Sequence, residues 1–187
     1  ALRVQGIENL MDAITDLSFI KEYPQEFGAR IYKISSDDQG NRLTHVKITG
    51  GVLNAKDKIG ADEKVDQIRL YNGKQFEMVQ TAYPGMICAL KGLNNYEVGQ
   101  GLGFESDTTK PLLNAYMNYQ LLLPEGVDAL TMMRYCSVLA QENPQLQIEY
   151  DEQTKQIFLR LMGSIQMEIL QKEIEKRSKV KVGFTTG

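Results

Sequence analysis

The chain has 187 residues, of which 42% are hydrophobic and 24% charged, and its formal net charge at neutral pH is −3. This composition is typical of a globular protein with one large domain or two small ones, and no segment approaches the roughly 20 unbroken apolar residues that a membrane span needs. The acidic total argues against a protein that grips nucleic acid with its whole surface, although local basic patches remain compatible with it. We therefore expect neither a membrane nor DNA as a partner.

The cysteines and the histidine predict no reactive site. Cys88 and Cys136 stand singly in apolar settings, without metal-ligand spacing, and we interpret both as core thiols in a reducing compartment. The only histidine, His45, lies on an alternating stretch, where a half-buried strand residue is a simpler interpretation than a catalytic base. The first ten residues do not resemble a signal peptide, so we expect a cytoplasmic protein.

Residues 1–26 predict a short amphipathic helix followed by a linker. Within residues 6–17, apolar side chains recur at helical spacing: Ile7, Leu10, Met11, Ile14 and Leu17. Pro24 and its charged neighbours favour a connector. A helix this short needs a surface to lie on, so we expect its partner to precede this chain.

Residues 27–108 predict a β-barrel domain. Five runs show period-two alternation and are bounded by turn residues: 29–35, 42–50, 64–73, 75–82 and 85–93. The polar residues 36–41 suit a hairpin loop, and Asn72 with Gly73 suits a tight turn with positive φ. Short strands at such regular spacing usually close into a barrel, because closure removes exposed edges.

Residues 109–187 predict an α+β domain. Residues 113–123 resemble a strand, residues 125–142 have helical periodicity, and two strands at 146–150 and 156–161 surround a turn. A second helix and a last strand at 179–184 complete the order β-α-β-β-α-β. This is the ferredoxin-like arrangement, in which two helices cover one face of a four-stranded sheet.

The sequence contains none of the motifs that carry common catalytic chemistry. It lacks a phosphate-binding G-x-x-x-x-G-K-[ST] loop, a G-x-S-x-G elbow, an H-E-x-x-H helix and any cysteine or histidine cluster. The acidic pairs Asp37–Asp38 and Asp151–Glu152 lie in polar turns, where solvated loop residues are the simpler interpretation. We therefore predict no catalytic, cofactor-binding or metal-binding residue in this chain.

Two basic features could contact phosphate groups. In residues 42–58 the cations Arg42, Lys47, Lys56 and Lys58 outnumber Asp57, and the Gly50–Gly51 turn is expected to expose backbone donors. A solvated strand face explains the same residues. The second feature, residues 172–181, has five basic and two acidic residues, but favourable interaction with a helix C-terminus explains those cations nearly as well.

The stretch 161–169, LMGSIQMEI, joins a predicted strand to the second helix of this domain. Gly163 permits a sharp turn, Ser164 is a good N-cap, and Ile165, Ile169 and Ile174 recur on one face. Packing explains those residues, but it does not explain the succession Gln166, Met167 and Glu168.

That succession resembles translation elongation factor G and its relatives, which carry a GMGELHLEI-like segment at the start of the second helix of their third domain. Met162, Gly163, Glu168 and Ile169 match it. Gln166 replaces the usual histidine, and with Met167 it is similar to the LGKVQMEV-like segment of the tetracycline-resistance ribosomal protection proteins. The departure favours that branch of the translational GTPase family.

The resemblance extends over nearly the whole chain. Residues 29–34 resemble the opening strand of the family's second-domain barrel, residues 43–59 its R-x-x-x-x-R-[VL]-x-S-G-x-L-x-x-x-D segment, and residues 82–103 its closing strands. Residues 1–14 are similar to the last helix of the GTPase domain. The resemblance therefore implies a middle fragment: the end of the GTPase domain, the barrel and the third domain.

The resemblance implies a docking role without catalysis. GTP and magnesium belong to the GTPase domain, whose nucleotide-binding segments this chain lacks, so we expect no GTP hydrolysis by the fragment itself. The barrel is expected to dock on small-subunit ribosomal RNA and the third domain to lie near a small-subunit ribosomal protein. By position in the family segment, Lys47, Gly50, Gly51 and Lys56 are the expected RNA contacts, and Met162, Gly163, Gln166, Met167 and Glu168 form the third-domain motif.

The leading hypothesis is a monomeric, ribosome-binding fragment of a GTP-dependent tetracycline-resistance protein. The middle domains of an elongation factor G paralogue acting in translocation are the closest alternative. A small hydrolase acting on acyl phosphates is another, but the connection at residues 121–130 offers neither the arginine nor the asparagine that such a site needs. A structural adaptor whose barrel binds protein is the third.

Overall fold

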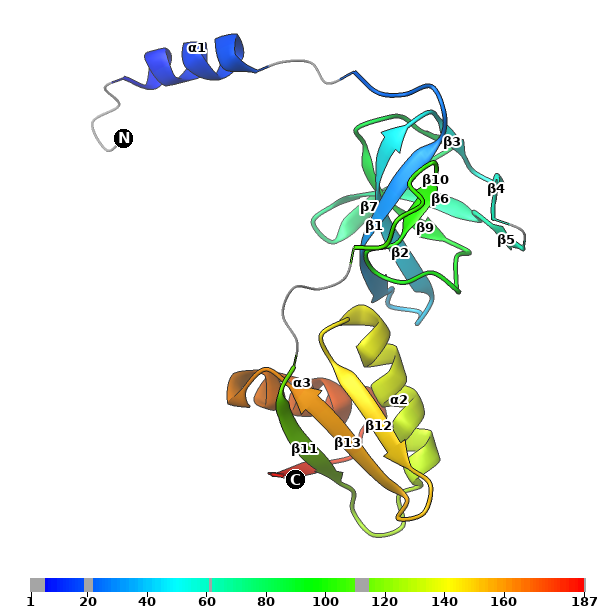
Figure 1. The fold of residues 1–187 in the computed structure, drawn as a ribbon, viewed down its shortest axis with the longest axis vertical. Coiled ribbons are helices and arrows are strands. Elements are labelled where there is room, and N and C mark those ends of the chain that lie inside the picture. The colour runs from blue at the N-terminus through cyan, green and yellow to red at the C-terminus, as the bar shows by residue number, and fades with distance from the viewer. Residues whose placement is uncertain (1–5, 19–21, 61, 110–114, 187) are drawn as a thin grey trace.

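The computed structural model describes residues 6–18, 22–60, 62–109 and 115–186. These residues form an N-terminal helix, a β domain and an α+β domain in chain order (Figure 1). The β domain and the α+β domain each have a hydrophobic core of their own. No helix among the described residues has the length and apolar character needed to cross a bilayer.

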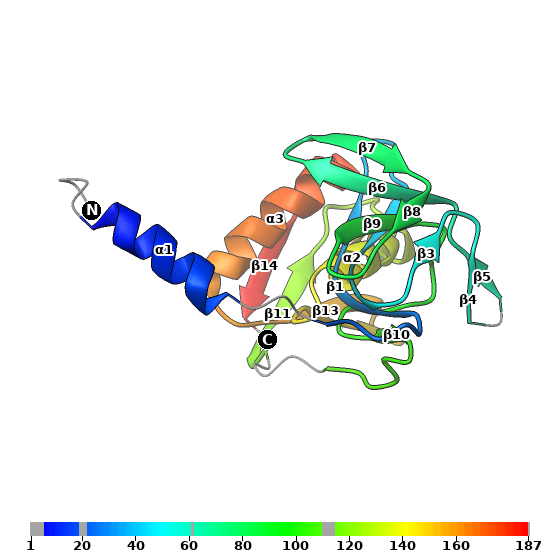
Figure 2. The same ribbon diagram turned by 90° about the horizontal axis from the view of Figure 1, so that it is seen from above.

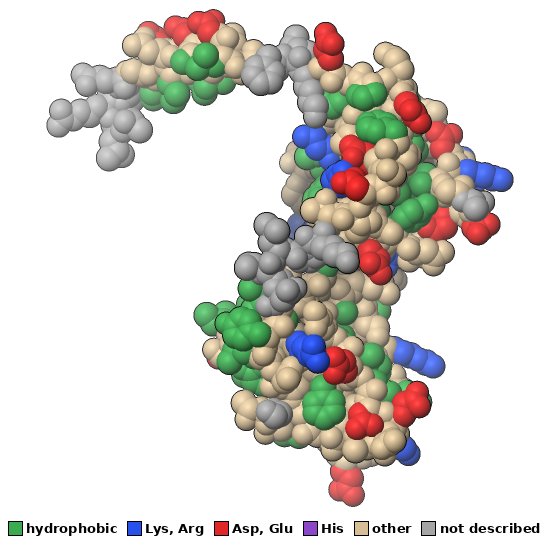
Figure 3. Space-filling view, in the orientation of Figure 1, with side chains coloured by type: hydrophobic (Ala, Val, Ile, Leu, Met, Phe, Trp, Pro, Cys, Tyr) green, Lys and Arg blue, Asp and Glu red, His purple; other side chains and the backbone are tan. Residues whose placement is uncertain are grey.

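Helix α1 (Ile7–Leu17) forms where the apolar periodicity predicts it. Gly6 occupies the N-cap with φ 78°, and no side chain caps the helix. None of its residues is buried, and Figure 3 shows its apolar side chains along one side and its acidic side chains along the other. The amphipathic helix is therefore confirmed, and its apolar stripe is uncovered in the described residues.

The β domain is built on a six-stranded antiparallel sheet with the order β10-β1-β2-β9-β6-β7. Its strands are β1 (Gly28–Ser36), β2 (Arg42–Gly50), β6 (Gln67–Asn72), β7 (Gln75–Val79), β9 (Ile87–Lys91) and β10 (Gly101–Gly103). Two short ladders accompany it, β3 (Leu53–Asn54) with β8 (Thr81–Ala82) and β4 (Lys58–Ile59) with β5 (Glu63–Lys64). In the described residues the edge strands β7 and β10 are not paired with each other, and the two short ladders are separate two-stranded sheets.

Alternating side chains of these strands fill one core. Ile31 and Ile34 of β1, Val46 and Ile48 of β2 and Leu90 of β9 are among its buried members. A register shift between Ile31 and Lys33 restores the alternation, because one extra residue in β1 returns the following side chains to the inner face. The predicted barrel core is thus confirmed, and its outer face is left to polar and aromatic residues.

Two local details differ from the predicted strands. The run at 64–73 is not a single strand, because Val65 is bonded to the backbone of Lys56 and Asp57 and the N–H of Asp66 donates to Lys91. The chain therefore changes partners between β5 and β6. The tight turn at Asn72 and Gly73 is confirmed, with Gly73 at φ 62° and Asn72 paired to Gln75.

The α+β domain has the predicted order β-α-β-β-α-β. Its elements are β11 (Met117–Leu122), α2 (Ala129–Glu142), β12 (Gln147–Asp151), β13 (Gln156–Leu161), α3 (Ser164–Ser178) and β14 (Gly183–Thr186). The antiparallel sheet has the order β12-β13-β11-β14, and both helices contribute to one core with it (Figures 1 and 2). Helix α2 begins later than predicted because Asp128 caps it, accepting a hydrogen bond of 2.9 Å from the Thr131 N–H. The last strand begins at Gly183, four residues later than its predicted start at 179.

The two domains meet where the β1–β2 hairpin approaches the C-terminal end of α2. The hydroxyl of Ser36 donates to Glu142 at 2.8 Å, and the other carboxylate oxygen of Glu142 pairs with Arg177 of α3 at 2.6 Å. Arg42 donates to the side chain of Gln141 and to the carbonyl of Tyr96. Polar side chains therefore join the barrel to both helices of the second domain.

Candidate functional site

Lys47 lies on the outer face of the barrel sheet. It is exposed in the middle of β2, opposite Arg30 of β1 and Ile87 of β9. The Arg30 guanidinium is neutralised by Asp107 at 2.7 Å and Glu105 at 2.5 Å, and these two carboxylates raise its pKa. No ion pair within the described ranges involves Lys47. Of the two neighbouring cations Arg30 and Lys47, Lys47 is therefore the one whose charge remains available to a phosphate.

The Gly50–Gly51 turn has a structural role that the sequence did not reveal. Gly51 has φ 57°, and its N–H donates to the carbonyl of Pro24 at 2.8 Å. A Cβ atom at Gly51 would lie 2.6 Å from the backbone nitrogen of Phe27, and one at Gly50 would lie 2.6 Å from the carbonyl oxygen of Glu26. The expectation of a free backbone donor at Gly51 is therefore wrong: the turn is glycine because the segment entering the barrel passes over it.

Lys56 lies between β3 and β4, outside the strand that carries Lys47. It has φ 77°, its backbone N–H donates to Val65 at 2.7 Å, and its exposed ammonium group lies 3.6 Å from Asp66. Such an exposed pair is weak, so the charge of Lys56 can still meet a phosphate. Lys47 and Lys56 therefore belong to different segments of the β domain. Their assignment as RNA contacts stays a prediction.

The other basic residues of the two predicted features are partly used inside the protein. Arg42 belongs to the domain boundary, where burial lowers the pKa of its guanidinium despite the nearby Glu63 and Glu97. Arg177 of the C-terminal feature pairs with Glu142 and, at 3.7 Å, with Glu173. Counting charges along the sequence therefore overestimated both basic surfaces.

The start of α3 is capped differently from the prediction. Gly163 occupies the N-cap in an extended conformation, and Ser164 is the first helical residue, so the N-cap assignment of Ser164 is wrong. Gln166 reaches back, and its Oε1 accepts a hydrogen bond of 2.7 Å from the Met162 N–H. This satisfies a backbone donor just outside the helix, as the glutamine of a capping box does, and it gives Gln166 a role that packing did not supply.

The apolar stripe of α3 also lies elsewhere than predicted. Leu170 and Ile174 are buried and Met167 packs against the same core, whereas Ile165 and Ile169 are 75% and 59% exposed. Glu168 lies on the exposed side of the helix. The segment 162–169 therefore presents two isoleucines and a carboxylate on its outer side.

The described residues hold no group of three or more metal-ligating side chains. Burial raises the pKa of the Cys88 thiol to about 12 and that of the Cys136 thiol to about 11, so both stay protonated at neutral pH. Such thiols are poor nucleophiles, in agreement with their interpretation as core residues.

Comparison with known proteins places both domains. Residues 26–103 match the family Elongation factor G domain 2, and residues 125–186 match Elongation Factor G, domain III. The chain belongs to the elongation factor G family. The fold of these two domains, a β domain followed by a β-α-β-β-α-β domain, is therefore the one that the resemblance implied.

Two curated relatives and one solved structure illustrate the match. The chain is 30% identical to the tetracycline resistance protein TetP of Clostridium perfringens, covering 96% of this chain and 29% of that protein. It is 26% identical to elongation factor G of a Ruegeria species, covering 84% of this chain and 24% of that protein. A crystal structure of a Thermus thermophilus protein superimposes with a TM-score of 0.75 at 17% identity, covering 96% of this chain and 29% of that chain. The chain thus spans less than a third of the length of these relatives.

A glycine substitution tests the close approach between the Gly50–Gly51 turn and the segment 24–27 that enters domain 2. Gly51→Ala should destabilise the domain by about 2 kcal/mol or more, because the alanine would face both a positive φ and a backbone contact. Gly40→Ala is the matched control, since Gly40 has φ 78° and open space around it, and it should cost about 1 kcal/mol. Urea denaturation measures both, and equal losses would contradict the role assigned to Gly51.

A second substitution tests the capping role in domain III. Gln166→Ala should lower the free energy of unfolding by about 1 kcal/mol, because the Met162 N–H loses its acceptor. Gln166→Glu keeps an acceptor oxygen and should retain stability. Thermal denaturation of the three proteins provides the measurement, and an alanine variant as stable as the parent would show that the hydrogen bond contributes nothing.

Proposed function

We propose that this chain is the non-catalytic, ribosome-binding middle part of a GTP-dependent ribosomal protection protein that releases tetracycline from the ribosome. The proposal rests mainly on the succession of elongation factor G domains 2 and III in a chain similar to a tetracycline resistance protein over 96% of its length. The Gln166–Met167–Glu168 segment supports the same branch. A ribosomal partner implies a cytoplasmic protein.

In this proposal the two domains bind and orient, and neither performs chemistry. The outer face of the barrel with Lys47, together with Lys56, approaches phosphates of small-subunit ribosomal RNA, and the exposed side of α3 near Glu168 meets a ribosomal protein. GTP binding and hydrolysis belong to a GTPase domain preceding α1, whose uncovered apolar stripe suits such a neighbour.

A net acidic chain can dock on RNA in this way. Each phosphate contact releases counterions, and a surface shared among several domains needs only a few contacts from each. The isolated fragment is therefore expected to bind weakly and with a salt dependence set by its own few lysines.

The alternative is the middle part of an elongation factor G paralogue that acts in translocation. It is favoured by the domain families themselves and by the relative named elongation factor G at 26% identity. The identities of 30% and 26% are close, so activity distinguishes the two functions better than similarity does.

The first test uses the complete gene product that contains this chain. Added with GTP to a cell-free translation reaction inhibited by tetracycline, it should restore protein synthesis, and it should not replace elongation factor G in a depleted reaction. Replacement of elongation factor G without any rescue from tetracycline would support the paralogue and reject ribosomal protection.

The second test concerns the two lysines. Lys47→Ala and Lys56→Ala should each weaken binding of this chain to small ribosomal subunits and lower the slope of log K against log salt by about 0.7 to 0.9. Lys155→Ala, at an exposed lysine in the turn between β12 and β13 outside the proposed contacts, is the control and should leave the slope unchanged. Unchanged slopes for Lys47→Ala and Lys56→Ala would remove both from the interface.

A further inference from the structure

Four aromatic rings form a continuous row across the outer face of the barrel sheet. The ring row consists of Tyr32 on β1, His45 on β2, Tyr71 on β6 and Phe76 on β7. The Tyr32 and His45 centroids lie 6.1 Å apart, those of His45 and Tyr71 6.1 Å, and those of Tyr71 and Phe76 5.4 Å. Each tyrosine and the phenylalanine is well exposed, at 48%, 39% and 45%.

The row is continuous because of a small residue on the strand between β2 and β6. Ala89 of β9 lies opposite His45 on one side and opposite Arg69 on the other. A larger side chain on this face would separate the histidine from Tyr71, since strands that are not adjacent lie about 9 to 10 Å apart. Ala89 thus allows the His45 ring on β2 and the Tyr71 ring on β6 to meet across β9 on the same face.

The rings are held in position by polar neighbours. Ser35 Oγ lies 2.8 Å from His45 Nε2, and the Arg69 guanidinium lies 4.4 Å from the centroid of the Phe76 ring. Burial, and secondarily the charge of Lys33, lowers the pKa of His45, so its ring is neutral at neutral pH. A neutral, oriented imidazole is an aromatic surface like its neighbours.

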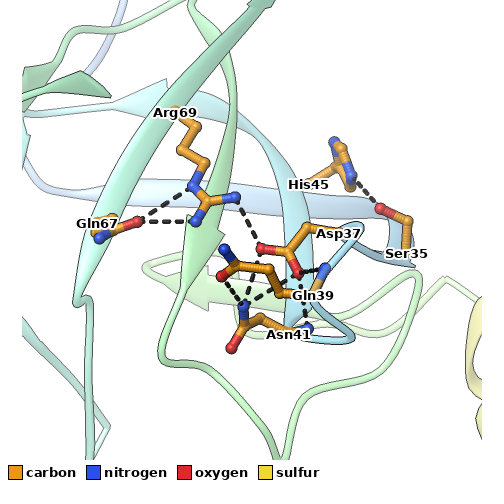
Figure 4. A network of polar contacts seen from close by, with 7 residues as sticks. All are labelled: Ser35, Asp37, Gln39, Asn41, His45, Gln67 and Arg69. Atoms are coloured by element: carbon orange, nitrogen blue, oxygen red, sulfur yellow. Dashed lines mark hydrogen bonds and ion pairs between the residues drawn. The ribbon is translucent and has the colours of Figure 1, made fainter. Parts of the chain in front are cut away.

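One wall beside the row is the β1–β2 hairpin loop, which a buried network fixes (Figure 4). Asp37 accepts hydrogen bonds from the Gln39 and Asn41 N–H groups at 3.0 and 2.8 Å and pairs with Arg69 at 3.1 Å. Arg69 also donates to Gln67 at 2.9 Å. Burial opposes ionisation of Asp37, but the hydrogen bonds from Asn41, Arg69 and Gln39 outweigh it and lower its pKa to about 2.

The loop and the sheet enclose a groove of about 700 Å³, which is lined by the rings of His45, Tyr71 and Phe76. Lys33, Lys74 and Asp38 also line it. Because Asp37 is already paired with Arg69, the charge left in the groove is two lysines against Asp38. A chain with a formal charge of −3 therefore has a locally positive, aromatic groove on this face.

We infer that the ring row and its groove are a stacking platform for unpaired ribosomal RNA nucleotides, with Lys33 and Lys74 beside the phosphates. This inference rests on the proposed function, because ribosome docking is what identifies the RNA as ribosomal. It adds that the barrel contacts bases as well as backbone.

The chemistry of the groove favours unpaired RNA over other partners. Exposed rings stack on splayed bases, whereas bases inside a duplex have their faces covered. The flanking lysines complement phosphates, and the Ser35 and Gln39 side chains are polar groups within reach of base edges. Because the Asp37 network already holds the groove open, little ordering cost opposes binding.

The test measures binding of a ten-nucleotide oligouridylate to this chain by fluorescence anisotropy. Tyr71→Leu and Phe76→Leu keep an apolar side chain but remove the aromatic face, and each should weaken binding about tenfold. Tyr135→Leu on α2 is the matched control, because Tyr135 is 37% exposed and Tyr71 is 39% exposed. The control should leave affinity unchanged, and a duplex RNA of equal length should bind more weakly than the single strand.

The phosphate contacts have a separate readout. The double variant Lys33→Ala and Lys74→Ala should lower the slope of log K against log salt by about 1.4 for the single strand. Circular dichroism and the unfolding midpoint of every variant are compared with the parent, so that loss of binding is read only from folded proteins.

The outcomes separate this inference from the proposed function. Ring variants that bind oligouridylate and ribosomal subunits as well as the parent does would overturn the platform while leaving ribosome docking intact. Ring variants that weaken binding to ribosomal subunits but not to oligouridylate would identify a protein contact and also overturn it. Ring-dependent binding to the oligonucleotide without binding to ribosomal subunits would support the platform and reject the ribosomal partner.

Discussion

The outer face of the barrel depends on the buried ion pair between Asp37 and Arg69, whose side chains are only 11% and 7% exposed. Two charges this far from water destabilise a fold unless hydrogen bonds satisfy their remaining donors and acceptors. Here Asn41 supplies donors to the carboxylate, Gln67 accepts from the guanidinium, and the Phe76 ring lies against it. Moving the hairpin loop would leave Arg69 without its anion, so the loop has one favoured position. That position defines the groove beside the ring row.

The distribution of charge explains how an acidic protein can present a surface suited to RNA. Several cations already have partners within the chain and are not available to RNA: Arg30, Arg42, Arg69 and Arg177. Lys33, Lys47 and Lys74 of the barrel, by contrast, remain exposed. Arginine is used where planar, fixed geometry is needed, and lysine where a mobile charge meets solvent. The net charge of −3 therefore says little about any one face.

Period-two alternation and helical periodicity were sufficient to predict both domains, because buried side chains of strands and helices repeat locally in sequence. The predictions failed where distant segments meet. Arg42 has the sequence pattern of a surface cation, but it donates hydrogen bonds to Gln141 and Tyr96, which are distant in sequence. The N-cap of α3 is a local exception, because Ser164 is a good N-cap by residue type and yet Gly163 takes that place. The ring row was not predicted, since residues 32, 45, 71 and 76 become neighbours only through the strand order β1-β2-β9-β6-β7. Their aromatic type was the only signal available.

Glu142 of α2 links the β1–β2 hairpin of the barrel to domain III. One carboxylate oxygen accepts from Ser36 at the end of β1, and the other pairs with Arg177 in α3, so one side chain joins the barrel to the helix that begins at the family segment. Glu142 is 17% exposed, and breaking either contact would leave part of a largely buried carboxylate without a partner. A rotation of domain III against the barrel therefore has to exchange these contacts for others. The same hairpin forms the groove wall, so Ser36, Glu142 and Arg177 connect that wall to α3 through two successive side-chain contacts.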